Sequence, residues 1–142
     1  MSKGNNLEND VLNIIFNATL DSALGVLSTT GNANLYVSLH TADPGEAGAQ
    51  NTSECAFGSY ARVAVARSGS GWTVSGNSAQ NAAIINFPEC TSGSETVTHV
   101  GIGTASSGTG RLYYKGALTA SRSVSSGITL QFAAGALTVT ED

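Results

Sequence analysis

Residues 35–48 read Leu35-Tyr36-Val37-Ser38-Leu39-His40-Thr41-Ala42-Asp43-Pro44-Gly45-Glu46-Ala47-Gly48, and this stretch decides the fold class. In its first half, apolar residues alternate with polar ones at the two-residue period of a half-buried β-strand. In its second half, Asp43-Pro44-Gly45 has the residues of a tight turn. The stretch therefore predicts a chain in which strands run directly into turns and loops.

The same alternation recurs along the rest of the chain. Clusters of Gly, Ser and Ala separate the apolar runs, as is typical of short strands joined by turns. Strands are expected at residues 34–40, 61–67, 72–74, 82–87, 96–103, 111–118, 120–124, 128–133 and 137–140. Short strands at this spacing predict a mainly β chain, with an antiparallel β-sandwich or jelly-roll-like domain over residues 34–142.

A helical pattern precedes the strands. Leu7, Val11, Ile14, Ile15 and Ala18 fall on one face of a helix. Asn6 is a suitable N-cap, and Leu20, Leu24 and Leu27 extend the pattern, so a helical segment is expected over residues 5–28. Its apolar stripe packs on the sheet of its own domain or forms an arm that docks onto a partner subunit. A chain of 142 residues without an internal linker predicts a single domain, 1–142.

Composition argues against two classes of partner. The formal net charge is −4, and six Lys and Arg residues cannot supply a stripe that neutralises phosphates, so no nucleic acid is expected. No apolar run approaches the roughly 18 residues that span a bilayer, so no membrane is expected. Met1-Ser2-Lys3-Gly4-Asn5-Asn6 leads into the helical pattern and not into a signal peptide, which predicts a product that stays in the cytoplasm of the cell that makes it.

The residues that could carry chemistry are few and badly spaced for it. His40 and His99 both lie within or at the ends of expected strands, and no serine lies in a Gly-x-Ser-x-Gly elbow. No His-x-His or Cys-x-x-Cys spacing points to a metal, and Gly101-Ile102-Gly103 lacks the third glycine of a dinucleotide loop. The sequence therefore predicts no catalytic residues, no metal and no cofactor.

Cys55 and Cys90 are the two cysteines, and two readings are open. In a reducing compartment a pair of cysteines is typical of free thiols. Alternatively, Cys55 precedes one expected strand and Cys90 follows another, so they could lie on adjacent strand ends and form a disulfide after lysis. In the chain-entropy model, a loop of about 35 residues would then be closed with a stabilisation of roughly 3–4 kcal/mol.

What remains is a surface that binds other proteins. Residues 41–59 form the one long expected loop, and loops of this length are uncommon unless they bind something or wrap a surface. Tyr36, Tyr60, Tyr113, Tyr114 and Trp72 are of the type enriched at interfaces, and strand arginines that face outward would form a basic patch. The expected partner interface comprises Leu7, Val11, Ile14, Ile15, Asp43, Pro44, Gly45, Glu46, Arg62, Arg67 and Trp72.

Six blocks, in order along nearly the whole chain, carry a resemblance to a known family. They are residues 35–48, Gly58-Ser59-Tyr60-Ala61-Arg62-Val63-Ala64-Val65, Ile85-Asn86-Phe87-Pro88, Thr96-Val97-Thr98-His99-Val100-Gly101-Ile102-Gly103, Leu112-Tyr113-Tyr114-Lys115-Gly116-Ala117-Leu118 and Phe132-Ala133-Ala134-Gly135-Ala136-Leu137-Thr138-Val139. The chain resembles small virion proteins of tailed bacteriophages that are usually labelled tail fibre proteins. It departs from them at Cys55 and Cys90, where small residues such as Ala are usual, and at Val100, where an aromatic residue is expected.

The resemblance implies a structural virion protein and not an enzyme, assembled in the host cytoplasm. Because the chain has no repeats or heptads that would build an elongated fibre, the leading hypothesis is a head decoration (cement) protein. It would be a homodimer or homotrimer that bridges and stabilises the major capsid protein. The alternative is a tail fibre or tail-tip module that contacts tail proteins and a host receptor, through tips such as residues 69–72 and 106–110. A carbohydrate-active enzyme is the third reading.

Overall fold

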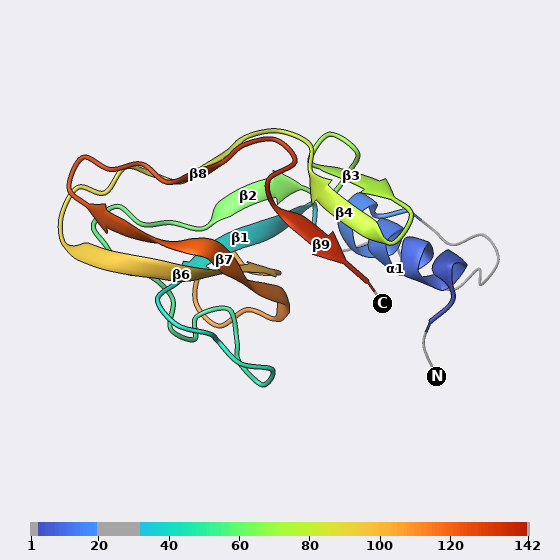
Figure 1. The fold of residues 1–142 in the computed structure, drawn as a ribbon, viewed down its shortest axis with the longest axis horizontal. Helices are drawn as coiled ribbons and strands as arrows, with labels where there is room; N and C mark the ends of the chain where they lie inside the picture. The colour runs from blue at the N-terminus through green and yellow to red at the C-terminus, as the bar shows by residue number, and fades with distance from the viewer. Residues whose placement is uncertain (1–2, 20–31, 142) are drawn as a thin grey trace. The chain divides into compact units, whose positions relative to one another are not determined.

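The computed structural model describes residues 3–19 and 32–141 (Figure 1). The predicted continuation of the helix through Leu20, Leu24 and Leu27 lies outside the described residues. The elements are α1 (Asn5–Asn17), β1 (Asn34–His40), β2 (Val63–Ala66), β3 (Trp72–Ser75), β4 (Ser78–Asn81), β5 (Ile85–Asn86), β6 (Ser94–Gly103), β7 (Leu112–Ser125), β8 (Gln131–Phe132) and β9 (Thr138–Thr140).

The strands form three sheets with the orders β2-β1-β6-β7, β3-β4-β9 and β5-β8. β1 pairs antiparallel with β6, in a register that runs from Tyr36 opposite Gly103 to His40 opposite His99. β6 pairs antiparallel with β7, and β4 pairs antiparallel with β3 and with β9. The predicted class is confirmed, since the chain is mainly β, with antiparallel sheets and an N-terminal α-helix.

Two strands differ from the prediction. β4, Ser78-Ala79-Gln80-Asn81, was not expected, because it contains one apolar residue and therefore lacks the alternation that marks a strand. It is held instead by its two neighbours and by Asn81, whose amide donates to the carbonyls of Ala83 (2.7 Å) and Ala133 (2.8 Å). The expected strands at residues 111–118 and 120–124 are one strand, β7, with an irregularity in its pairing opposite residues 97–99 of β6.

The chain forms two compact units, and each is described by itself. The first comprises residues 1–34, 65–85 and 132–142 and contains α1 and the β3-β4-β9 sheet. α1 lies against β3 and β4 (Figure 1). Leu12 and Phe16 of the helix are fully buried, and the Phe16 ring lies 4.6 Å from the Trp72 ring of β3, centroid to centroid. The predicted parts of the domain are a helical segment, 5–28, and a sandwich, 34–142. In the structure, α1 packs against β3 and β4, which belong to the second of these parts. The single domain remains a prediction.

The buried face of α1 is not the predicted stripe. Glu8, Leu12 and Phe16 are buried, whereas Leu7 is 43% exposed and Val11, Ile14 and Ile15 are half-buried. The predicted N-cap is also wrong, because the helix begins at Asn5 after Gly4 and has no side-chain cap. The predicted stripe contains more apolar residues than the face with Leu12 and Phe16. Leu12 and Phe16 are nevertheless the apolar residues of α1 that are buried in the core.

The last turn of α1 is held by Arg67, which follows β2. The Arg67 guanidinium donates to the carbonyl oxygens of Ile14 (2.6 Å) and Ile15 (2.8 Å). Such carbonyls have no partner within the helix, and a cation there also interacts favourably with the helix dipole. Within residues 3–19 and 32–141, no helix is long and apolar enough to cross a membrane.

The second unit comprises residues 35–64 and 86–131 and is built around β1, β6 and β7. Val37, Leu39, Val97, Val100 and Ile102 are among its buried apolar residues. The alternation of residues 35–40, which predicted the strand, does not separate a buried face from an exposed one. Ser38 and His40 are fully buried as well, so both faces of β1 are covered.

Cys55 and Cys90 are buried free thiols in this unit, so the disulfide alternative is not what the structure shows. The Cys90 thiol donates to the carbonyl oxygen of Ser92 at 3.2 Å. Burial, together with the neighbouring Glu95 carboxylate, raises the pKa of the Cys55 thiol to about 12. A thiol that stays protonated and buried is unreactive, and Cys55 is therefore a packing residue.

Candidate binding surface

Residues 41–59 do not form the structureless loop that their length suggests, because backbone hydrogen bonds close the segment on itself and join it to β1. The Thr41 N–H donates to Ser53 O (2.9 Å), and the Cys55 N–H donates to Leu39 O (2.9 Å). His40 and Glu54 form an isolated β-bridge. The segment, named here the cover loop, is thus a fixed part of the second unit.

His40 is the buried polar residue that connects β1 to the cover loop. Its Nδ1 lies 2.9 Å from Thr52 O, and its Nε2 lies 2.9 Å from the Ser38 hydroxyl oxygen. Because a carbonyl can only accept, Nδ1 carries the proton and Nε2 accepts from Ser38. A Cβ at Gly101 would lie 2.7 Å from Nε2, so this position on β6 needs glycine. These contacts use both ring nitrogens for structure.

Burial lowers the pKa of His40 below 6.5, against the opposing effects of Thr52 O and Glu54 and in the same direction as Arg62 and His99. The unfolded chain therefore takes up the proton first as the pH falls. The free energy of unfolding should be flat above pH 6.5 and decrease below it, down to the lowered pKa. Urea denaturation between pH 7.5 and 5 measures this. The His40→Gln variant should lose most of this slope, and the His99→Gln variant should retain it. An unchanged slope in His40→Gln would assign it to another group.

Gln50 joins the cover loop to the segment between β6 and β7. Its side chain is fully buried, and Nε2 donates to Tyr36 O (2.9 Å) while Oε1 accepts from the Ala105 N–H (3.1 Å). Its backbone N–H donates to Gly110 O at 2.9 Å, and Ala49 forms a β-bridge with Arg111. Sequence reasoning missed Gln50, because one glutamine in a polar loop carries no signal until its partners are known.

Arg62 fixes the same two segments through charge. Its Nε and Nη2 donate to the Glu54 carboxylate at 2.6 and 2.7 Å. The remaining donors reach Ala105 O (2.9 Å) and Gly108 O (2.6 Å). Tyr60 completes the cluster, because its hydroxyl donates to Glu54 at 2.9 Å and accepts from the Leu39 N–H at 3.0 Å. The Arg62 side chain is only 2% exposed, so it holds loops in place and is not presented to a partner.

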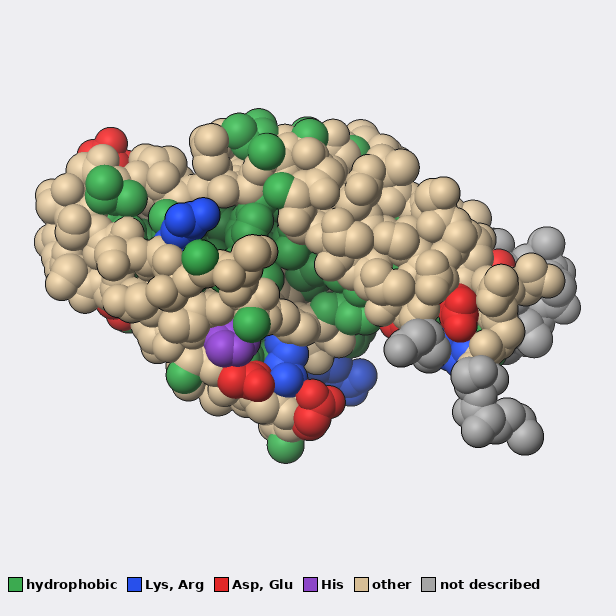
Figure 2. All heavy atoms as spheres, viewed as in Figure 1, with side chains coloured by type: hydrophobic (Ala, Val, Ile, Leu, Met, Phe, Trp, Pro, Cys, Tyr) green, Lys and Arg blue, Asp and Glu red, His purple; other side chains and the backbone are tan. Residues whose placement is uncertain are grey.

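The outer side of the cover loop carries an ion cluster. Lys115 Nζ of β7 lies 3.1 Å from both Asp43 Oδ1 and Glu46 Oε1. The Gly45 N–H and then Lys115 lower the pKa of Asp43, and hydrogen bonds to Asp43 and Glu46 raise the pKa of Lys115. Figure 2 shows acidic and basic side chains next to one another on this face, together with a histidine. The cluster has one positive and two negative charges, so it is not the basic patch that strand arginines predicted.

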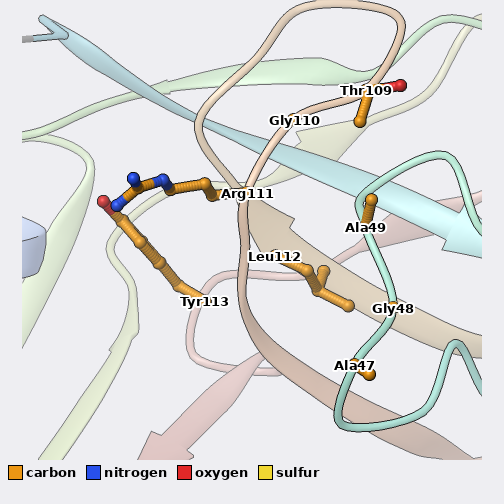
Figure 3. A pocket seen from close by; sticks show the side chains of 8 residues that line it. All are labelled: Ala47, Gly48, Ala49, Thr109, Gly110, Arg111, Leu112 and Tyr113. Atoms are coloured by element: carbon orange, nitrogen blue, oxygen red, sulfur yellow. The ribbon is translucent and has the colours of Figure 1, made fainter.

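Beside this cluster lies a groove of about 410 Å³ between the cover loop and the start of β7 (Figure 3). Small residues form most of it, and Leu112 points toward the cover loop. Arg111 and Tyr113 project from the other side of β7 and point in a common direction (Figure 3). The groove is lined by Ala47, Gly48, Ala49, Thr109, Gly110, Arg111, Leu112 and Tyr113.

The structure brings together only part of the predicted interface. Asp43, Gly45 and Glu46 lie at the surface next to the groove, with Pro44 buried beneath them. Two other predicted contacts are wrong: Trp72 is fully buried against Phe16, and Arg62 is enclosed by Glu54 and two carbonyls. Arg67 donates to the end of α1. Of the proposed loop tips, residues 69–70 and 106–109 are exposed.

The side chains that could carry chemistry on this face are bound to other groups of the protein. Within residues 3–19 and 32–141, no three His, Cys, Asp or Glu side chains lie together in a way that could hold a metal ion. His40 is occupied by Ser38 and Thr52, and Asp43 by Gly45 and Lys115. This face has two loops held by hydrogen bonds, a groove and exposed side chains, which are typical of a binding surface.

The described residues thus form a mainly β chain with hydrogen-bonded loops beside an open groove. The family model described as Podophage GP4 fiber I protein gp80 matches residues 4–140, so the chain belongs to this family of phage fibre proteins. It is therefore a structural protein of the phage virion, as the sequence resemblance predicted. A search of curated proteins finds no match.

Proposed function

We propose that this protein is a component of a phage tail fibre that contacts the host surface through the face formed by the cover loop and residues 104–113. The observation that carries the proposal is the rigid support beneath this face. Gln50, which belongs to the cover loop, hydrogen-bonds to Ala105 and Gly110. Arg62 hydrogen-bonds to Glu54 of the cover loop and to residues 105 and 108, and both side chains are buried. Loops fixed in this way lose little conformational entropy on binding, which favours affinity.

The family description supports the fibre role over head decoration, because it names a fibre protein. An elongated fibre needs repeats or heptads, but a small module carried by a fibre does not. Such a module needs only an attachment and an exposed binding face. Contact, and not catalysis, is its role in this proposal.

Binding of the purified, fluorescently labelled protein to host cells tests the proposal. Saturable binding that unlabelled protein displaces is the expected result. In parallel, quantitative mass spectrometry of purified virions gives the number of copies relative to the major capsid protein. A few copies per particle support a fibre. Absence of cell binding together with a ratio near parity would overturn the proposal in favour of head decoration.

A further inference from the structure

The side chain of one arginine beside the groove makes no ion pair or hydrogen bond with the described residues. All six Lys and Arg residues lie in the described part of the chain. Lys3 pairs with Glu141, Lys115 with Asp43 and Glu46, and Arg62 and Arg67 donate to groups already described. Arg111 and Arg122 are exposed, and neither guanidinium has a hydrogen bond or ion pair with a described residue. Arg111 is the one of these two that lines the groove.

An exposed aromatic ring accompanies it. Tyr113 is 47% exposed and lines the same groove. The pairing of β6 with β7 is irregular here, because Ile102 faces Tyr114 whereas Gly103 faces Leu112. Tyr113 is thus the extra residue of a β-bulge, a device that changes the direction of a side chain and is common beside functional sites. The bulge holds the ring in solvent, two residues from Arg111.

We propose that Arg111 and Tyr113 bind a saccharide that carries an anionic group, a carboxylate or a phosphate. This inference rests on the proposed contact with the host surface. A guanidinium binds a carboxylate or phosphate with two parallel hydrogen bonds. The face of a tyrosine ring packs on the apolar C–H face of a sugar, and its hydroxyl stays available for hydrogen bonding. Together the two side chains match one acidic sugar residue.

Sugar residues that extend from these two side chains over β7 would reach the groove, which lies on the side of the strand that Leu112 faces (Figure 3). Gly48 and Gly110 add no side chain to the groove, and Thr109 is an exposed residue whose hydroxyl accepts from Asn51 at 3.4 Å. Pockets of a few hundred Å³ with a small number of polar groups are of the size that binds small ligands. Nearby, Asp43 and Glu46 carry two negative charges against the single positive charge of Lys115. This face therefore accepts one anionic group and not a continuous polyanion.

Titration with defined saccharides tests the inference. The probes are an oligosaccharide of hexuronic acid, its carboxyl-reduced neutral counterpart and mannose 6-phosphate, each titrated by NMR or calorimetry into the full chain. We expect binding of at least one anionic probe, binding of the neutral counterpart at least tenfold weaker, and weakening by added salt. The hexuronate and phosphate arms distinguish the two anionic groups.

Two variants localise the site. Arg111→Gln and Tyr113→Ala should each weaken the bound anionic probe about tenfold or more, whereas Arg122→Gln, which removes the other unpaired arginine, should leave it unchanged. Equal binding of the acidic and neutral probes, or equal losses in Arg111→Gln and Arg122→Gln, would overturn the inference. If the wild type binds host cells but the Arg111→Gln/Tyr113→Ala protein binds them equally well, this site fails while the proposed function stands.

Discussion

Replacing Phe16 by alanine is expected to lower the free energy of unfolding by about 3–5 kcal/mol, the usual cost of removing a fully buried phenylalanine. Phe16 is 0% exposed, and its ring packs at 60° to the Trp72 ring at 4.6 Å. The substitution loses this contact and leaves a cavity between α1 and β3. Urea denaturation followed by the fluorescence of Trp72, the single tryptophan, measures the change next to the altered site.

Leu7→Ser is the matched control. Leu7 belongs to the apolar stripe that the sequence pointed to, yet it is 43% exposed. Its replacement should leave stability almost unchanged, and deletion of residues 1–17 should act as Phe16→Ala does, only more strongly. A Phe16→Ala protein with wild-type stability that no longer assembles would instead show that α1 is an arm for a partner subunit.

The helix shows how far sequence periodicity reaches. The position and type of α1 followed from the spacing of apolar residues, because that spacing depends only on helix geometry. The buried face did not follow, because Leu7, Val11, Ile14, Ile15 and Ala18 outnumber Leu12 and Phe16. Which face is buried depends on the strands that the helix meets, and those strands come from residues 72–81, far along the sequence.

The strands were predictable wherever an alternating pattern marks them, as in β1, β6 and β7. β4 was not, because its four residues contain one apolar side chain and it is held by two flanking strands and by Asn81. The candidate surface was predictable in part. The cover loop and residues 106–110 were both expected to be exposed, but nothing in the sequence indicated that Gln50 and Arg62 join them. Contacts between segments more than 50 residues apart are set by the fold.

Arg62→Met is expected to lower the free energy of unfolding by about 3–5 kcal/mol, the cost of breaking a buried ion pair by removing one partner. The substitution keeps an unbranched apolar chain in place of the aliphatic part of arginine, so the main loss is one of charge and hydrogen bonds. It leaves the Glu54 carboxylate, whose side chain is 15% exposed, with only Tyr60 as a side-chain donor, and it frees the carbonyls of Ala105 and Gly108. Arg122→Met, which removes an exposed arginine that has no partner among residues 3–19 and 32–141, should leave stability unchanged.

A double-mutant cycle decides whether the charge pair itself is responsible. Glu54→Gln keeps the shape and removes the charge that Arg62 meets, so the Arg62→Met/Glu54→Gln protein should be more stable than the sum of the two single losses predicts. The reason is that neither single variant can avoid an unpaired charge in a poorly solvated site, whereas the double variant has none. Strict additivity, with both losses large, would show that Arg62 acts only through the carbonyls of Ala105 and Gly108. In that case, the support of the binding surface would come from hydrogen bonding between the loops and not from the ion pair.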